Sequence, residues 1–198
     1  MALPLSQMRF TPDEYLEFER NAEIRHEYID GHVYAMSGES RHHSRVNVNL
    51  ISEVRNQLKG KRCEAFSPNM KVRSLSTSYS YPDLSVVCGE AAFHDNYGDV
   101  LVNAKVIFEI LSPSTESYDR GKKFLRYQTI ETFTDYILIS QDEPYIEHRA
   151  RQSNGQWTIT WATGLESSLY LASIECELKL SEIYDRVVFP EVEESSEF

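Results

Sequence analysis

The chain has 198 residues, a length that fits one domain with a sizeable buried core. Hydrophobic residues make up 41% and aromatic residues 12%, which excludes a disordered chain and indicates a globular one. The net charge of −11 argues against a protein that simply coats nucleic acid. The charge is uneven, because residues 131–198 carry 14 acidic and 4 basic side chains, whereas residues 1–130 carry 17 and 16. A phosphate-facing surface is therefore expected in the first two thirds of the chain.

Membrane and redox signals are weak. No apolar run approaches the roughly 20 residues that cross a bilayer, and no apolar stretch precedes Arg9 and Asp13 as in a signal peptide. The three cysteines, Cys63, Cys88 and Cys176, are widely spaced and do not have zinc-finger spacing. We therefore predict a soluble cytoplasmic protein whose thiols are buried and reduced.

The first expected element is a short helix. Thr11 and Glu14 have the spacing of a capping box, and Pro12 suits the first helical position. The helix is expected to end near Arg20.

A hairpin and a longer helix are expected next. Asp30-Gly31 lies between β-forming residues within the stretch 26–36, which predicts a hairpin turn with Glu27 on its first strand. Apolar residues at helical spacing then predict a helix over residues 42–58.

The rest of the chain is expected to be mainly strands. A helix is predicted over residues 118–130, after the break at Ser112-Pro113-Ser114, and Asn154-Gly155 predicts a tight turn. Strands are predicted over residues 62–66, 71–74, 81–88, 105–111, 135–140, 145–151, 156–162 and 169–176. Together these elements indicate one mixed α/β domain over residues 1–190, followed by an acidic tail over residues 191–198.

Asp83 stands at the entry of an apolar strand. The preceding Pro82 is tolerated at the first residue of a strand. Because side chains alternate, Asp83, Ser85 and Val87 are expected to share one face.

Glu109 interrupts the apolar run 106–111, which otherwise reads as a central, doubly buried strand. An ionised glutamate in such a run is costly unless it is paired or binds a cation. Two carboxylates on neighbouring strands can hold Mg²⁺, which prefers oxygen ligands. The structural alternative is that Asp83 caps a turn and Glu109 pairs with a buried arginine.

A basic cluster near the start of the third helix supplies a candidate lysine. In the stretch 119–127, Lys123 and Tyr127 stand four residues apart, as do Lys122 and Arg126. A lysine beside the carboxylates could orient the attacking water or stabilise a pentacovalent oxyanion. The alternative is an ordinary solvated helix face.

These motifs resemble a known family. Tyr-Pro-Asp at 81–83, Phe-Glu-Ile-Leu-Ser-Pro-Ser-Thr at 108–115, Tyr-Asp-Arg at 118–120 and Lys-Phe-Leu-Arg-Tyr at 123–127 resemble the Uma-two restriction-endonuclease family, which is placed in the PD-(D/E)xK nuclease superfamily. The resemblance runs from about Thr11 to Arg151. It implies a restriction-endonuclease-like fold with a central mixed β-sheet flanked by helices.

The resemblance also implies a site. Mg²⁺ or Mn²⁺ would be held by Asp83, Glu109 and the Ile110 carbonyl. The lysine that the superfamily places two residues after the glutamate is here Leu111, and Lys123 matches the family's displaced lysine. Lys122 is the neighbouring alternative.

Further candidates have two interpretations each. Glu27 and His43 match the family pattern. Glu27 is either a further metal-site carboxylate or a surface group, and His43 is either a proton shuttle or a residue that stabilises the helix start. A basic stretch could contact phosphate or only solubilise an edge hairpin; it comprises Lys59, Lys61, Arg62, Lys71 and Arg73.

The sequence thus predicts a metal-dependent nuclease that hydrolyses a DNA phosphodiester, with Asp83, Glu109, Lys123 and Glu27 in its active site. The expected partner is nucleic acid, and a homodimer is a reasonable form because double-strand cutting needs two active sites. The alternatives are a catalytically inactive nuclease fold that binds DNA or protein, and a purely structural or self-associating β domain.

Overall fold

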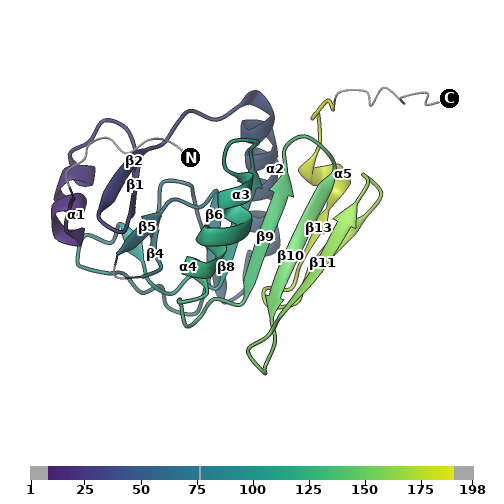
Figure 1. Ribbon diagram of the computed structural model, residues 1–198. Coiled ribbons are helices and arrows are strands. Elements are labelled where there is room, and N and C mark those ends of the chain that lie inside the picture. Colours follow the sequence, from purple (N-terminus) through teal and green to yellow (C-terminus); the bar gives the residue numbers. More distant parts are fainter. Residues whose placement is uncertain (1–8, 76, 190–198) are drawn as a thin grey trace.

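The computed structural model describes residues 9–75 and 77–189, so the predicted acidic tail lies outside the described residues. The main body is a six-stranded mixed sheet in the order β11-β10-β9-β8-β6-β3 (Figure 1). Its strands are β3 (Cys63–Phe66), β6 (Leu84–Cys88), β8 (Val106–Leu111), β9 (Asp135–Ser140), β10 (Tyr145–Arg151) and β11 (Trp157–Thr163). The mixed central sheet flanked by helices confirms the predicted fold class.

A second sheet lies beside the first and has the order β2-β1-β5-β4-β7. Its strands are β1 (His26–Ile29), β2 (His32–Ala35), β4 (Lys71–Arg73), β5 (Ser78–Ser80) and β7 (Val100–Leu101). Helix α1 (Pro12–Arg20) packs at its side, where Tyr15 and Leu16 are buried against the aromatic cluster around Tyr28 and Tyr79. The capping box between Thr11 and Glu14 is present as predicted.

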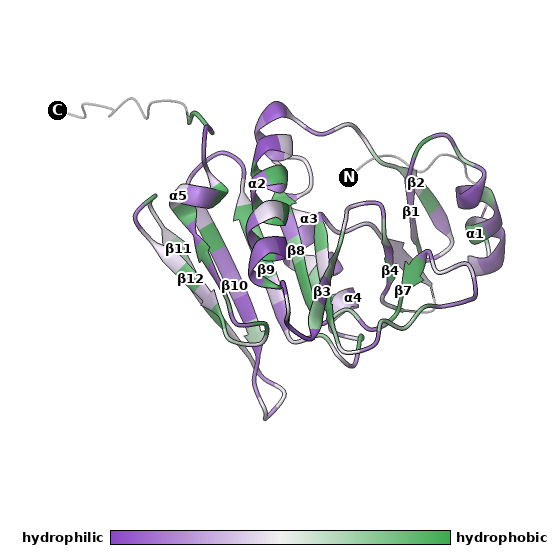
Figure 2. Cartoon of the chain, turned by 180° about the vertical axis from the view of Figure 1, so that it is seen from behind, coloured by the Kyte–Doolittle hydropathy of each residue, from purple (hydrophilic) through white to green (hydrophobic). Residues whose placement is uncertain are grey.

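Helices cover both faces of the six-stranded sheet. Helix α2 (Arg41–Gln57) lies across one face, together with the hairpin of β12 (Ser168–Leu171) and β13 (Cys176–Lys179) and the short α5 (Leu180–Ile183), as Figure 2 shows from behind. The opposite face is covered by α3 (Glu116–Tyr118), a π-helical turn over Asp119–Lys123, and α4 (Phe124–Tyr127). Two apolar clusters, one for each face, fill these interfaces.

The pairing of β8 with β9 explains why the second helical layer exists. These strands are parallel, with Glu109 opposite Leu138. Parallel neighbours need a crossover that returns the chain to the same end of the sheet, and the helical segment 116–127 is that crossover. It therefore packs on the face to which Ile107, Glu109 and Leu111 point.

Most predicted elements are confirmed within a residue or two. In the hairpin of β1 and β2, Asp30 and Gly31 both have positive φ, +51° and +92°, as the two central residues of a type I′ turn require. The strand predicted over residues 81–88 begins only at Leu84, and the strand predicted over residues 169–176 is wrong, because these residues are not a single strand. The chain reverses between Leu171 and Cys176, and those two residues face each other in the β12–β13 hairpin.

The prediction of three reduced thiols is wrong for two of them. Cys63 and Cys88 are directly opposite in the antiparallel pair β3–β6 and form a disulfide. Their separation of 25 residues gave no local sign of this pairing, which the strand register brings about. Cys176 is a buried free cysteine, as expected.

Candidate active site

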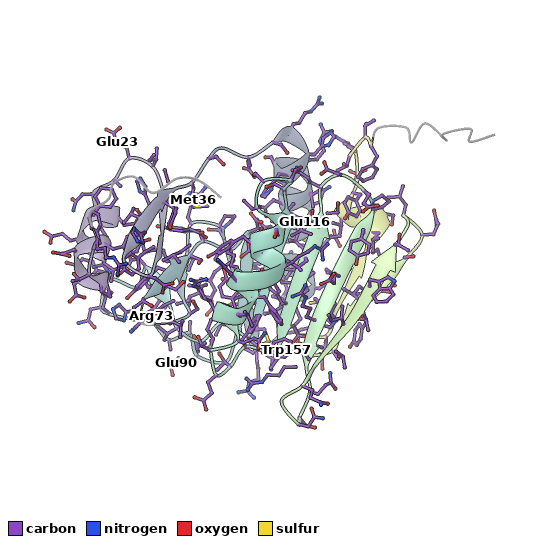
Figure 3. The ribbon with its side chains drawn as sticks, viewed as in Figure 1. Glu23, Met36, Arg73, Glu90, Glu116 and Trp157 are labelled. Atoms are coloured by element: carbon purple, nitrogen blue, oxygen red, sulfur yellow. A yellow bond between two sulfur atoms is a disulfide. The ribbon has the colours of Figure 1, made fainter. Side chains whose placement is uncertain are left out.

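The candidate site is a cavity of about 550 Å³ between the two sheets. Its walls come from the β1–β2 hairpin and the segment after it, the first turns of α2, the adjacent ends of β6 and β8, and the helical segment that begins at α3. Figure 3 labels Met36, after β2, and Glu116, on α3. Met36 lines the cavity, and so does Thr115, the residue before Glu116. The cavity is lined by all the predicted site residues: Glu27, Asp83, Glu109, Ile110 and Lys123.

Glu109 and Lys123 form the buried centre of this site. The Lys123 ammonium lies 2.8 Å from Glu109 Oε1, and the Tyr127 hydroxyl donates a hydrogen bond of 2.9 Å to the same oxygen. Both residues of the pair are more than 90% buried. The partner of Glu109 is thus a lysine, not the arginine of the structural alternative, and Lys123 and Tyr127 reach it because they stand one helical turn apart.

Lys123 also faces two further carboxylates. Its Nζ atom lies 3.5 Å from Glu27 Oε1 and 3.5 Å from Asp119 Oδ1. Glu27 in turn accepts a hydrogen bond of 3.3 Å from the Tyr81 backbone N–H, on the segment that leads to Asp83. One ammonium therefore neutralises part of the charge of three acidic side chains.

Burial and the neighbouring charges shift the pKa of Glu109, Asp119 and Lys123. Burial raises the pKa of Glu109 well above its ordinary value, against the opposing effect of Lys123. Burial likewise raises the pKa of Asp119. For Lys123 burial acts in the lowering direction, but Glu109 and Glu27 outweigh it and hold its pKa well above the ordinary value. The cavity thus has an excess of acidic groups around a charged lysine, an arrangement that favours an additional cation.

Asp83 is fixed between an imidazole and a backbone amide. Its Oδ1 lies 2.9 Å from His43 Nε2, and its Oδ2 accepts a hydrogen bond of 2.7 Å from the Ile110 N–H. This second bond joins the entry of β6 to the end of β8, so Asp83 and Glu109 open into the same cavity. His43 sits in the first turn of α2, where its own N–H is capped by the Ser40 hydroxyl.

A π-helical turn sets the direction of Lys123. The carbonyl of Asp119 accepts a hydrogen bond from the Tyr136 hydroxyl at 3.1 Å, and the carbonyl of Arg120 accepts one from Arg149 Nη1 at 2.7 Å. Side chains of β9 and β10 thus bind carbonyls that an α-helix would use for its own hydrogen bonds. The widened turn presents Lys123 to the cavity.

Leu111 occupies the position where the superfamily has its lysine. Its side chain belongs to the apolar cluster under α4, together with Phe124, Tyr127 and Tyr136. Lys123 enters the cavity from the helical layer above, so the ammonium reaches Glu109 by another route. The other candidate, Lys122, does not line the cavity.

Sequence reasoning missed several residues of this site. Asp119 is one of them, although its spacing of four residues from Lys123 is a signal that could have found it. Tyr127 has the predicted spacing from Lys123, but its hydrogen bond to Glu109 was not predicted. Tyr118 and Asn47 also line the cavity, and no pattern in the sequence indicated this.

Three residues of the predicted basic stretch are engaged in contacts within the fold. Lys71 is buried and pairs with Asp99 at 2.9 Å, and Arg73 contacts His94 at 2.8 Å. Lys61 binds backbone carbonyls near Glu175. These contacts engage Lys61, Lys71 and Arg73 within the fold, and the phosphate role of the stretch stays a prediction.

The donor chemistry of the cavity fits a hard divalent cation. Among residues 9–75 and 77–189, no cluster of three or more His, Cys, Asp or Glu side chains is arranged as a ready-made metal cage. Mg²⁺ is commonly held by one or two carboxylates and keeps several waters, so the oxygens of Asp83 and Glu109 are suitable donors. The cavity therefore suits a divalent cation because of its oxygen donors and its excess of acidic groups.

The fold and this carboxylate and lysine cavity define a restriction-endonuclease-like α+β protein. A crystal structure of a putative nuclease belonging to DUF820 from Anabaena variabilis superposes with a TM-score of 0.74 and 19% identity, covering 90% of this chain and 99% of that one. The chain belongs to the Uma2 family, described as "Putative restriction endonuclease", whose model matches residues 12–181.

Two proteins of Synechocystis are similar in sequence. The uncharacterised protein slr1290 is 36% identical over 153 residues, which cover 76% of this chain and 79% of that protein. The uncharacterised protein sll1609 is 33% identical over 155 residues, which cover 78% and 88%. Among the described residues, no helix is both long and apolar enough to span a bilayer.

Proposed function

We propose that this protein is a metal-dependent nuclease that hydrolyses a phosphodiester bond of nucleic acid, with DNA as the expected substrate. The observation that carries the proposal is the convergence of Asp83, Glu109 and Lys123 on one cavity, from three parts of the chain. Membership of a family described as restriction endonucleases supports it.

Each residue has a distinct task in this proposal. Asp83 and Glu109, with the Ile110 carbonyl, would hold the divalent cation, and Glu27 would assist from the hairpin. Lys123 would contact the reacting phosphate or the attacking water, because its positive charge is buried and fixed. His43 and the Ile110 N–H fix the Asp83 carboxylate, and Tyr127 fixes Glu109, so that neither carboxylate must reorganise.

Bound Mg²⁺ or Mn²⁺ would supply a water of lowered pKa and offset charge on the phosphoryl oxygens. In its absence, Lys123 is the buried positive charge beside Glu27, Glu109 and Asp119. The same lysine is suited to a phosphate once a cation neutralises the carboxylates, because it would then be freed from part of its ion pairing.

A second candidate function is a binding module that has lost catalysis. The observation that favours it is the tight contact between Lys123 and Glu109, since a lysine engaged in an ion pair serves the fold without any chemistry. This module would bind nucleic acid or protein with the cavity intact and would cleave nothing.

A cleavage assay separates the two. Purified protein is incubated with Mg²⁺ or Mn²⁺ and a mixed panel of DNA and RNA, beside the Glu109→Ala variant. The proposal expects cleavage that requires the cation and is lost in the variant. Cleavage that survives the substitution, or none on any substrate, contradicts the proposed activity.

A further inference from the structure

Two residues that line the cavity carry buried polar atoms for which the proposed catalysis has no use. The Tyr118 hydroxyl and Asn47 Oδ1 are both buried, and neither has a hydrogen-bond partner among the described residues. Asn47 is 94% buried, and both residues line the cavity. An orphaned buried polar atom costs about 1–3 kcal/mol, so such atoms call for a ligand or a water. Burial raises the pKa of Tyr118, so its hydroxyl keeps its proton and can donate.

The size and depth of the cavity limit what can bind. At about 550 Å³ it lies within the range of pockets that enclose a small ligand. Glu109 and Lys123 lie at its floor and are only 4% and 6% exposed. An intact duplex is a wide, rigid cylinder whose paired bases cannot enter such a space. A strand whose bases are unpaired can lower one phosphate and its base into the cavity.

One wall of the cavity is suited to a base. Tyr34 on β2 is directly opposite Glu27 on β1, so the two side chains share one face of the hairpin. Tyr34 and Met36 are half-buried and line the cavity beside the carboxylates. Aromatic side chains bind bases by stacking with little sequence preference, at about 1–3 kcal/mol per base.

We infer that the cavity takes an unpaired nucleotide of a nucleic-acid strand, with Tyr118 and Asn47 as hydrogen-bonding groups for it and Tyr34 as a stacking surface. The inference rests on the proposed function, because it deepens the substrate class of the same site. The substrates are therefore single strands, flaps, bulges or frayed ends. Fully paired duplex is excluded.

The binding test uses Glu109→Gln protein, which should bind without cutting. Its affinity is measured for a labelled single-stranded oligonucleotide and for a relaxed, covalently closed circular duplex that contains the same sequence. The single strand should bind at least about tenfold more tightly, which corresponds to about 1.4 kcal/mol. Equal binding of both would overturn the inference.

Substitutions of the orphaned groups give the sharper test. Tyr118→Phe and Asn47→Leu should each weaken single-strand binding about five- to tenfold, the equivalent of one lost hydrogen bond. Neither should lower the melting temperature, because each removes a buried polar atom without a partner. Tyr170→Phe, on the exposed face of β12, is the matched control and should bind as the parent does. Weaker binding that tracks a lower melting temperature would assign these residues to the fold and overturn the inference.

A cleavage assay on the parent protein distinguishes this inference from the proposed function. Cutting of the single strand and of a bulged duplex, with the relaxed circular duplex left intact, supports both. Cutting of the relaxed circular duplex at an equal rate overturns the inference and leaves the nuclease standing. Selective binding of the single strand without any cutting supports the inference and contradicts the nuclease.

Discussion

Lys123 Nζ lies 2.8 Å from Glu109 Oε1 at the floor of the cavity, and the surroundings of the two residues differ. Lys123 faces three carboxylates, whereas Glu109 has both Lys123 and the Tyr127 hydroxyl as partners. The two members of this ion pair should therefore contribute unequally to stability.

Lys123→Met should lower the free energy of unfolding more than Glu109→Gln does. It leaves Glu109, Glu27 and Asp119 close together without their cation, and removal of one partner of a buried pair costs about 3–5 kcal/mol. Glu109→Gln keeps an acceptor for Tyr127 and leaves Lys123 two other carboxylates, so about 1–2 kcal/mol is expected. Urea unfolding of both variants measures the free energies. Equal losses would contradict this account, and Lys122→Met is the control because Lys122 is outside the cavity.

Divalent cations should stabilise the folded protein. A ligand at one hundred times its dissociation constant adds about 2.7 kcal/mol, and a domain of this size gains about 2–4 °C in melting temperature per kcal/mol. Thermal unfolding with and without Mg²⁺ or Mn²⁺ should show a rise of several degrees.

Two variants test whether this rise in melting temperature depends on the proposed cation site. Asp83→Ala should abolish the rise in melting temperature, whereas Glu131→Ala, an exposed acidic residue away from the cavity, should keep it. A rise that persists in the Asp83 variant would locate the cation elsewhere.

Acid should weaken the contact between α1 and the loop that precedes β7. Burial alone would raise the pKa of Asp99, but hydrogen bonds from Arg20 and Lys71 lower it to about 2. Because the folded-state pKa lies below the ordinary value of 3.8, the unfolded chain binds more protons in this window. The stabilisation from Asp99 is thus complete above about pH 4 and is lost as the pH falls toward 2. Asp99→Asn should reduce the acid dependence of the free energy of unfolding between these values; an unchanged slope would contradict the pairing.

Reduction of the disulfide should destabilise the fold. Cys63 and Cys88 close a loop of 25 residues between β3 and β6, and cross-links of that span contribute about 3 kcal/mol. The melting temperature should therefore fall with a strong reductant. The Cys63→Ser variant should start from the lower value and be insensitive to the reductant. A parent protein that melts alike in both conditions would show that its thiols are not paired.

The sequence by itself determined the local elements and the identity of the acidic residues. The capping box at Thr11, the turn at Asp30-Gly31 and the glutamate inside the apolar run 106–111 are signals carried by residues close together in the chain. The spacing of Lys123 and Tyr127 also placed them on one helix face. Local backbone preferences and side-chain periodicity suffice for predictions of this kind.

Only the tertiary structure decided which distant residues meet. The crossover between parallel strands brings Lys123 onto Glu109, and the Ile110 N–H ties Asp83 to the neighbouring strand. The strand register that joins Cys63 to Cys88, and the burial that leaves Tyr118 without a partner, likewise depend on how whole layers pack. Contacts across tens of residues leave no periodic trace in the sequence, because they follow from the order and direction of strands in the sheet.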